Sequence, residues 1–171
     1  MSYQKEYTQE YLKDLLGNRN TQYNDTELEA NVKNVSISST LIEELIIGMN
    51  TLKGAIRVKM KDTILFNMLS LTPRDLLWEK VELEFPEYEF ASIRVQRYEP
   101  TDMCEQHRDN IHKGYSTFSI RLNEGDSRFY VGSKLMEEKV GEGYLLPENT
   151  LHSVNTGKDT RYSLVAWLKL K

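Results

Sequence analysis

Hydrophobic positions in the first part of the chain recur mainly at helical spacing. Four of them lie four residues apart, at Tyr3, Tyr7, Tyr11 and Leu15. This spacing places the side chains on one face and predicts an amphipathic helix over residues 3–16, whose aromatic stripe we interpret as a packing face. Gly17 ends the pattern, and residues 17–31 are polar enough to predict a loop.

Two further helices are predicted in the first half, each from a pattern typical of a helix start. Thr40 and Glu43 form a capping box. The apolar face that follows consists of Leu41, Ile42, Leu45, Ile46 and Met49. Thr72 followed by Pro73 resembles a second start, because proline is favoured at the first helical position. Before both of them, Val32–Ile37 alternates well enough to predict a short strand.

From residue 88 onward, short runs with β-branched or aromatic residues at alternate positions replace the helical pattern. The predicted strands are Ser92–Tyr98, Thr117–Leu122, Arg128–Val131, Gly143–Leu146, His152–Asn155 and Arg161–Leu168. Such strands after a helical half favour an α+β fold, in which a β-sandwich or small barrel carries helices on one side. The 171 residues fit a single domain, with a mainly helical support region (1–88) and a β-rich core (89–171).

Composition narrows the class of protein. Hydrophobic residues make up 39% of the chain and charged residues 28%, which supports a folded core and argues against wholesale disorder. The net charge of −4 gives no sign of a nucleic-acid surface, which needs clustered Lys and Arg. Cys104 is the only cysteine, so no intrachain disulfide can form, and the first residues contain no apolar signal region. We therefore expect a soluble cytoplasmic protein without a membrane partner.

The candidate chemistry lies in two segments near the C-terminus, which contain two of the three histidines. In an extended strand, residues i and i+2 point to the same face, so His107 and Asp109 can bind one metal ion while Arg108 points away. His152 is the best third donor in a strand-like segment. Two imidazoles and a carboxylate form the facial triad of a non-haem Fe(II) centre, which leaves three positions open. Structural zinc sites are instead closed and tetrahedral, with more sulfur or nitrogen ligands.

Arg161 follows His152 by nine residues, across a turn that contains Thr156–Gly157. If the chain reverses there, positions 152 and 161 lie opposite each other; if the turn crosses between two sheets, both side chains still point into one interior. Either way a guanidinium lies within reach of the metal and can bind the distal carboxylate of a dicarboxylic ligand. Ser163 shares its face and offers a hydroxyl donor. His112, the third histidine, is expected to be exposed or on the substrate side.

The same segments resemble the 2-oxoglutarate/Fe(II)-dependent oxygenase superfamily, and within it the prolyl-hydroxylase-like branch. The resemblance covers residues 91–168. It rests on Ile93–Tyr98 before the metal motif, on His107–Asn110, on Phe118–Asn123, on Gly143–Pro147, on Leu151–Val154 and on Thr160–Trp167. Two departures stand out: Gly125–Ser127 replaces a frequent pair of glycines, and Arg121 stands where the branch often has a tyrosine.

This resemblance implies a double-stranded β-helix (jelly-roll) core with N-terminal helices packed on one side. The Fe(II) ligands would be His107, Asp109 and His152. Arg161 would bind the C5 carboxylate of 2-oxoglutarate, and Tyr98 would add a hydrogen bond to this co-substrate. Ser163 is a further candidate donor because it shares the face of Arg161. Arg121 would be a second carboxylate clamp, a substrate anchor or an exposed strand residue. The oxidant would be O2, with ascorbate in a supporting role.

The activity that the resemblance implies is hydroxylation of a C–H bond by a 2-oxoglutarate-dependent dioxygenase. A prolyl or other residue in a peptide is the first expectation, and a free amino acid or other small molecule is the alternative. A rival from another class is a non-catalytic β-sandwich binding module. Loops commonly carry the specificity of a rigid scaffold. The side chains expected near the substrate are Arg108, His112, Lys113, Tyr115 and Arg128, a basic and aromatic mixture suited to an acidic or carboxylate-bearing substrate.

Overall fold

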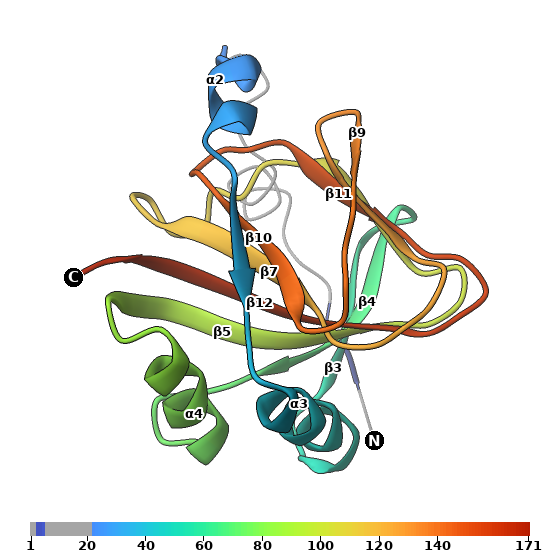
Figure 1. Cartoon of the computed structure of the whole chain (residues 1–171). Coiled ribbons are helices and arrows are strands. Elements are labelled where there is room, and N and C mark those ends of the chain that lie inside the picture. Colours follow the sequence, from blue (N-terminus) through green and yellow to red (C-terminus); the bar gives the residue numbers. More distant parts are fainter. Residues whose placement is uncertain (1–2, 6–21) are drawn as a thin grey trace.

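The computed structural model describes residues 3–5 and 22–171 (Figure 1). In these residues three helices, α2 (Asp25–Ala30), α3 (Ser39–Thr51) and α4 (Leu76–Glu84), accompany a curved sheet. Its strands are β1 (Tyr3–Lys5), β2 (Lys33–Ser36), β3 (Ile56–Lys61), β4 (Ile64–Ser70), β5 (Tyr88–Tyr98), β6 (Met103–His107), β7 (Ser116–Arg121), β8 (Arg128–Val131), β9 (Lys134–Met136), β10 (Glu142–Leu146), β11 (His152–Asn155) and β12 (Arg161–Leu170). No helix within the described ranges is long and apolar enough to cross a membrane.

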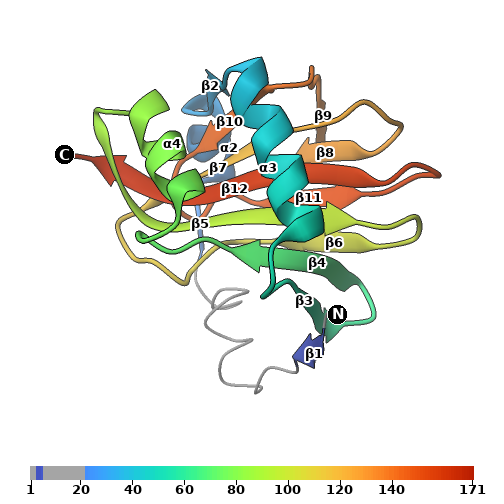
Figure 2. The same cartoon turned by 90° about the horizontal axis from the view of Figure 1, so that it is seen from below.

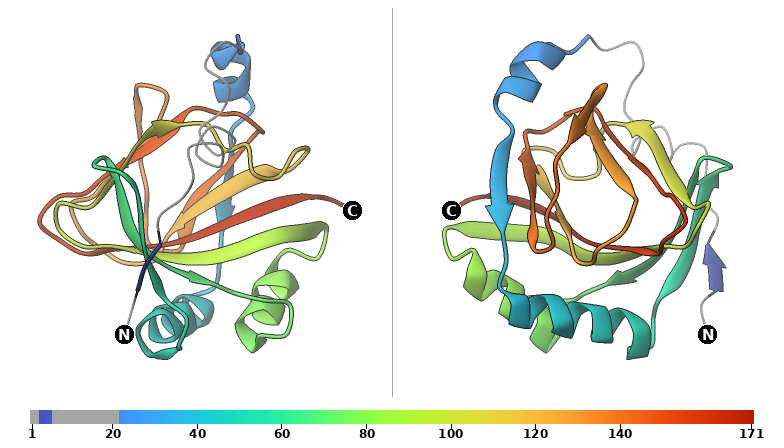
Figure 3. Two further views of the ribbon diagram at one scale, coloured as in Figure 1. Left: turned by 180° about the vertical axis from the view of Figure 1, so that it is seen from behind. Right: turned by 45° about the vertical axis from the view of Figure 1, so that its right-hand side comes forward.

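The sheet folds back on itself through β4, so its strands form two walls that face each other (Figure 3). The helix-side wall contains β10, β7, β12 and β5 in that order, and the opposite wall contains β6, β11, β8 and β9. One half of β4, Asn67–Ser70, pairs with β5, whereas Ile64 and Leu65 pair with β6. Two antiparallel walls of four strands each make a double-stranded β-helix, which confirms the predicted α+β jelly roll.

Helices α3 and α4 lie against the outer surface of the helix-side wall (Figure 2). Successive residues of a strand point to opposite faces, and the apolar residues of β12 point toward these helices. Leu164, Ala166 and Leu168 join Leu45 of α3 and Val81 of α4 in one cluster, and each of the five is at most 1% exposed. The alternate residues of β12 point into the space between the walls: Arg161, Ser163, Val165 and Trp167. The outer face of β12 therefore holds the fold together, while the inner face is available for chemistry.

A second apolar cluster lies between the two walls. It includes Phe66 of β4, Tyr98 of β5 and Phe129 of β8, and the rings of Phe66 and Tyr98 have centroids 5.3 Å apart. Ile64 and Val58, from the β3–β4 hairpin, are also buried there. The interior is thus partly filled by apolar side chains, and the polar residues of the candidate site lie beside them.

The strands predicted from residue 88 onward are confirmed. Arg128–Val131 and His152–Asn155 have the predicted bounds. The strands β5 and β12 are longer than predicted, because they pair with each other along nearly their whole length, from Tyr98 opposite Arg161 to Tyr88 opposite Leu170. The added residues, Tyr88–Ala91 and Lys169–Leu170, are exposed or partly buried, so backbone pairing and not burial extends the two strands.

The first part of the chain differs from expectation. Residues Tyr3–Lys5 form a strand that pairs with β3, so the helix predicted over 3–16 is wrong there, and residues 6–16 lie outside the described residues. The loop predicted for residues 17–31 contains α2, whose cap Asn24 accepts a hydrogen bond from the Glu27 amide at 3.2 Å. Strands β3 and β4 add sheet to a region expected to be mainly helical, although the apolar and basic residues of Ile56–Lys61 do alternate.

Both predicted helix starts are shifted along the sequence. Ser38, rather than Thr40, caps α3, and its Oγ accepts a hydrogen bond from the Leu41 amide at 3.3 Å. Helix α4 begins after Asp75, whose Oδ2 accepts a hydrogen bond from the Thr72 amide at 2.6 Å. The Thr72–Pro73 pair therefore belongs to the turn before the helix, and the prediction of proline at the first helical position is wrong.

Candidate active site

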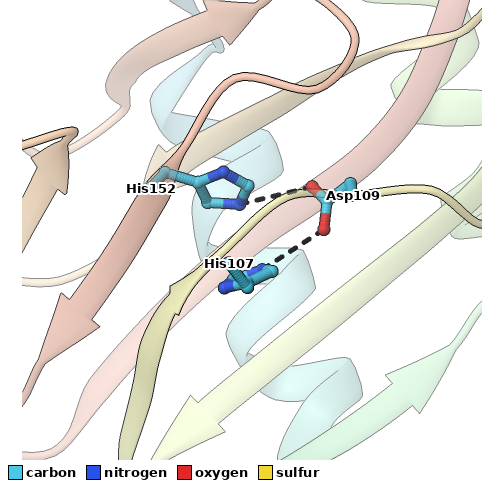
Figure 4. Close-up of side chains that lie close together, drawn as sticks. All are labelled: His107, Asp109 and His152. Carbon is cyan, nitrogen blue, oxygen red and sulfur yellow. Dashed lines mark ion pairs between the residues drawn. The ribbon is translucent and has the colours of Figure 1, made fainter. Parts of the chain in front are cut away.

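Three predicted ligands come together between the two walls (Figure 4). The Nε2 atom of His107 lies 3.2 Å from Oδ1 of Asp109, and the Nε2 atom of His152 lies 3.3 Å from Oδ2. The candidate ligand atoms of the three residues all lie within 4.8 Å of one another. Neighbouring ligands on an octahedral ion lie about 3 Å apart when metal–ligand bonds are about 2.1 Å. The spacing of this triad therefore fits one divalent ion.

Strand pairing explains why these residues meet. His107 ends β6 and His152 begins β11, and the two residues are paired directly across the ladder. Asp109 lies two residues beyond the end of β6, so its carboxylate turns back toward both imidazoles. Arg108 points away, as predicted, and its Nη1 lies 2.6 Å from Oδ1 of Asp25 in α2. The ion pair between Arg108 and Asp25 fixes the segment that connects two of the ligands.

Hydrogen bonds to the backbone orient both imidazole rings. The Nδ1 atom of His107 lies 2.8 Å from the Glu105 carbonyl oxygen, and that of His152 lies 2.8 Å from the Thr150 carbonyl oxygen. A carbonyl oxygen only accepts, so each Nδ1 carries the hydrogen and each Nε2 is directed at Asp109. Metal-binding histidines commonly have such a partner on the nitrogen that does not bind the ion. The donor set is therefore arranged for metal binding by Nε2.

The triad shifts the acid–base behaviour of its own members. Burial opposes the charged form of Asp109, but the charges of His152 and His107 and their hydrogen bonds outweigh it, and the pKa of Asp109 lies well below its usual value. Burial likewise opposes protonation of His107, yet the nearby Cys104 sulfur and the Asp109 carboxylate raise its pKa well above the usual value. The site thus favours a positive charge next to an ionised carboxylate, which is what a divalent cation supplies.

The triad opens into a pocket, called the metal pocket below, with walls from both sheets. It is lined by Val58, Met60, Ile64, Phe66, Met68, Arg94, Gln96, Tyr98, Cys104, His107, Asp109, Thr117, Ser119, Phe129, His152, Val154, Val165 and Trp167. Most of these side chains are apolar. An apolar wall limits the access of water to a metal centre, and few polar groups then fix the orientation of a ligand.

Tyr98 was predicted to contact a co-substrate, and the structure places it in the wall of the metal pocket. Its hydroxyl donates a hydrogen bond to Oε1 of Gln96 at 3.1 Å. Burial is the largest cause that raises the pKa of Tyr98 well above its usual value, so the hydroxyl keeps its proton and remains a donor. Gln96 was not singled out in the sequence, although it lies on the same face of β5 as Tyr98.

The turn after β11 crosses to the helix-side wall, which is the second of the two arrangements expected from the sequence. The side chain of Arg161 therefore points into the space between the walls. Its side chain is fully buried, and its Nε donates to Oγ of Ser163 at 2.8 Å. The end of its guanidinium is engaged by the carboxylate of Glu138, with Nη1–Oε1 and Nη2–Oε2 distances of 2.8 and 2.9 Å. The predicted anchor for a carboxylate therefore already binds one from the chain itself.

Arg121, the other arginine proposed for the co-substrate, organises the turn after β7. Its Nε, Nη1 and Nη2 donate hydrogen bonds to the backbone carbonyls of Asn123, Ser127 and Gly125, at 2.7, 2.9 and 2.8 Å. Its Nη1 also lies 3.6 Å from Oε1 of Glu138. Arg121 is only 4% exposed, so the alternative of an exposed strand residue is wrong. Because its guanidinium donates to three backbone carbonyls, Arg121 stabilises the conformation of this turn.

The side chains expected near a substrate occupy several different places. Tyr115 donates a hydrogen bond to Glu89 at 3.2 Å, and Lys113 and Arg128 are exposed. None of these three residues lines the metal pocket, and neither do Arg108 and His112. His112 comes nearest, since its ring centroid lies 5.6 Å from that of Trp167 in the pocket wall.

Two functional candidates escaped sequence reasoning. Arg94 of β5 lines the metal pocket, and its guanidinium carbon lies 4.7 Å from the centroid of the Trp167 ring. Its position on the same face as Gln96 and Tyr98 was a usable signal. Glu138 lies in the loop between β9 and β10, in an ordinary charged run, and no periodicity indicates that its side chain turns inward.

Solved structures of several enzymes have a similar architecture. A viral collagen prolyl hydroxylase from Paramecium bursaria Chlorella virus-1, in its 2-oxoglutarate complex, superposes with a TM-score of 0.62, with 13% identity over 82% of this chain and 96% of that one. A prolyl-4-hydroxylase from Pseudomonas putida gives 0.62, with 14% identity over 85% and 97% of the two chains. The chain shares its fold with 2-oxoglutarate/Fe(II) oxygenases. No protein-family model and no curated protein matches the sequence.

The fold comparison does not distinguish enzymes of different activity. The α-ketoglutarate-dependent epimerase SnoN from nogalamycin biosynthesis also superposes with a TM-score of 0.62, with 12% identity over 84% of this chain and 81% of that one. Two prolyl hydroxylases and an enzyme of nogalamycin biosynthesis thus match this chain equally well in fold. Function has to be argued from the site, because one fold supports many activities.

Proposed function

We propose that this chain is an Fe(II)- and 2-oxoglutarate-dependent oxygenase that hydroxylates a C–H bond. The observation that carries the proposal is the facial triad of His107, Asp109 and His152, placed at a largely apolar pocket inside a fold shared with oxygenases of this type. Two imidazoles and one carboxylate with open positions are the ligand set typical of non-haem Fe(II) oxygenases. When bound, the iron and 2-oxoglutarate supply the oxidation of the C–H bond.

The residues of the chain would hold, orient and shield these groups. His107 and His152 are fixed by their carbonyl partners, so Nε2 of each imidazole would be the atom that binds the ion. Asp109, ionised at neutral pH, balances part of the charge of the ion. Tyr98 presents a protonated hydroxyl in the pocket. The buried guanidinium of Arg161, which pairs with Glu138 in this structure, would bind a distal carboxylate in its place.

For the substrate, we keep a peptidyl residue, with proline as the first candidate, and a small carboxylate-bearing molecule as the second. A specific observation favours an oxygen-rich substrate. Nε of Arg94 and Nε1 of Trp167, two residues that line the metal pocket, are buried and have no hydrogen-bond partner within the described residues. Buried donors are normally paired, so a ligand with carboxylate or carbonyl oxygens would satisfy them. A free amino acid offers a carboxylate, and a peptide offers carbonyl oxygens.

Binding spectroscopy tests the proposal without knowledge of the substrate. Anaerobic addition of 2-oxoglutarate to the Fe(II)-loaded protein should produce a weak visible absorption band, from charge transfer between iron and the chelating 2-oxo acid. The His107→Ala variant should not produce it. Absence of the band in wild-type protein that binds iron would support the non-catalytic binding module instead.

The substrate class needs a separate experiment. We would compare, by mass spectrometry, the proteome and metabolites of cells that express the wild type with those of cells that express Asp109→Ala. Hydroxylated proline in a defined protein would support the peptidyl assignment. A hydroxylated metabolite with an unchanged proteome would support the small-molecule assignment.

A further inference from the structure

Glu138 is a buried carboxylate on a surface loop. It lies between β9 and β10, where its neighbours Glu137 and Lys139 are exposed. The side chain of Glu138 is nevertheless only 2% exposed, because it turns inward between the two walls. Burial of a carboxylate is costly unless it is paired, so its partners decide what the side chain does there.

The main partner of Glu138 is Arg161, and most of the N–H donors of this arginine are already engaged. Nη1 of Arg161 donates to Oε1 of Glu138 and to Oγ of Ser127, Nη2 donates to Oε2 of Glu138, and Nε donates to Ser163. A guanidinium has five N–H groups, so these four contacts leave one. A second carboxylate therefore cannot form a two-point pair with the end of Arg161 while Glu138 is in place.

We propose that Glu138 is a built-in competitor that occupies the carboxylate anchor, and that its side chain leaves Arg161 when a dicarboxylic 2-oxo acid binds. The inference rests on the proposed function for the identity of the ligand. The two-point pair between Glu138 and Arg161 is observed independently of that function. It is the kind of contact that the distal carboxylate of 2-oxoglutarate would make. Glu138 is thus a specificity residue that weakens the binding of 2-oxoglutarate.

The exchange conserves charge in the interior. Arg161 and Arg121 place two guanidinium groups around one carboxylate, since Nη1 of Arg121 lies 3.6 Å from the same oxygen of Glu138. Replacing the Glu138 carboxylate by that of a ligand leaves the number of buried charges unchanged. Glu138 itself would move toward solvent, where its exposed neighbours already lie, and would regain its hydration.

The backbone next to Glu138 restricts this movement. The Gly141 amide donates to the Arg121 carbonyl at 2.7 Å, and its carbonyl accepts from the Ile37 amide at 2.9 Å. Gly141 has a φ of +82°, and an added Cβ would lie 2.9 Å from Cδ1 of Ile42, so the turn is fixed in a form that suits glycine. The Glu137 carbonyl also accepts a hydrogen bond from the Tyr144 hydroxyl, and the Lys139 carbonyl accepts one from the Glu142 amide at 3.0 Å. The backbone on both sides of Glu138 is therefore held to β10, and the movement that we propose is confined to the Glu138 side chain.

Metal-free protein provides the first test, because it requires no iron chemistry. We would follow thermal unfolding of the wild type, Glu138→Ala and Glu138→Gln with and without glutarate, a five-carbon dicarboxylate without the 2-oxo group. Glutarate should raise the unfolding midpoint of both variants by several degrees more than that of the wild type. Glu137→Gln, an exposed neighbour in the same loop, is the matched control and should behave like the wild type.

Iron-loaded protein provides the second test. Under anaerobic conditions, Glu138→Gln should bind 2-oxoglutarate about tenfold more tightly than the wild type, because the anchor is no longer occupied by an ionised carboxylate. Pyruvate, a 2-oxo acid without a distal carboxylate, should bind both proteins equally. If Glu138→Ala does not fold, Glu138→Gln and the shorter Glu138→Asp carry the comparison, since both keep a polar group near Arg161.

The two tests separate failure of this inference from failure of the proposed function. Glutarate that stabilises the Glu138 variants, with no iron–2-oxoglutarate band in any protein, would retain the competitor role and overturn the oxygenase. A band in the wild type, with the same 2-oxoglutarate affinity in Glu138→Gln and no differential effect of glutarate, would overturn the competitor role and retain the oxygenase.

Discussion

The two faces of β12 show how differently a core and a site are built from one strand. On the outer face, Leu164, Ala166 and Leu168 pack against helices α3 and α4. On the inner face, Arg161 and Ser163 make directional hydrogen bonds whose partners include Glu138, from a distant loop. Apolar packing tolerates other apolar side chains of similar volume, whereas a buried charge requires a partner in a suitable geometry. We therefore expect the outer face to tolerate conservative apolar substitutions, and the inner face to tolerate few substitutions of any kind.

The largest effect should follow removal of the carboxylate that the inner site presents to the metal. Asp109→Ala deletes one of three ligands, and we expect Fe(II) affinity to fall by more than about 100-fold, since loss of mere supporting residues already costs 10–100-fold. Metal content by atomic spectroscopy measures this directly. Retention of stoichiometric iron at wild-type affinity would show that the triad is not the metal site.

Arg161→Ala should be the most destabilising change on the inner face of β12. It leaves the buried Glu138 carboxylate with only the longer 3.6 Å contact to Arg121, and breaking a buried pair from one side costs about 3–5 kcal/mol. The double variant Arg161→Ala/Glu138→Ala should regain part of this stability. Denaturant unfolding of the single and double variants forms the cycle, and additive losses would indicate that the two residues do not interact.

Leu164→Ala tests the outer face of the same strand. Leu164 is fully buried, so we expect a loss of about 2–5 kcal/mol in the free energy of unfolding. The protein that remains folded should bind Fe(II) with unchanged affinity, because the cavity opens on the side away from the metal pocket. A parallel loss of metal affinity would mean that the two faces of β12 are not independent.

Metal affinity should increase with pH. The pKa of His107 is raised above its usual value of about 6.5, and binding of a metal by Nε2 must displace a proton from that ring. Below the raised pKa, affinity should therefore increase by up to about tenfold per pH unit and then level off. Titration with Mn(II), followed by electron paramagnetic resonance, avoids oxidation of iron. Constant affinity from pH 6 to 8 would contradict a protonated His107.

The smallest predicted effect concerns Arg94, at the wall of the metal pocket. Arg94→Ala should weaken binding of a carboxylate-bearing substrate by about tenfold, the typical value of one charge-assisted contact. Iron and 2-oxoglutarate affinity should not change, which distinguishes a substrate contact from a structural one. Arg94→Lys retains the charge and should recover part of the binding, and equal losses in both variants would assign Arg94 to packing against Trp167.

The sequence predicts local patterns better than distant partners. The strands β8 and β11 and the pair of His107 and Asp109 were predictable, because alternation and i, i+2 spacing depend on neighbouring residues. His152 was predicted differently, as the one further histidine in a strand-like segment. Helix α2 was missed because polar residues dominate it and none of its residues is buried, so its short pattern lacks an apolar face. Glu138 was missed for a different reason. Only the folded chain brings it to Arg161, 23 residues away in the sequence.

Turnover of the co-substrate tests the central claim most directly. Purified protein would be incubated with Fe(II), ascorbate, O2 and 2-oxoglutarate, with candidate peptides and amino acids present, and succinate would be quantified against a His107→Ala control. The account predicts oxygen-dependent succinate release by the wild type, with none above background in the variant. Equal succinate in the two proteins, or none from wild-type protein shown to contain iron, would contradict it.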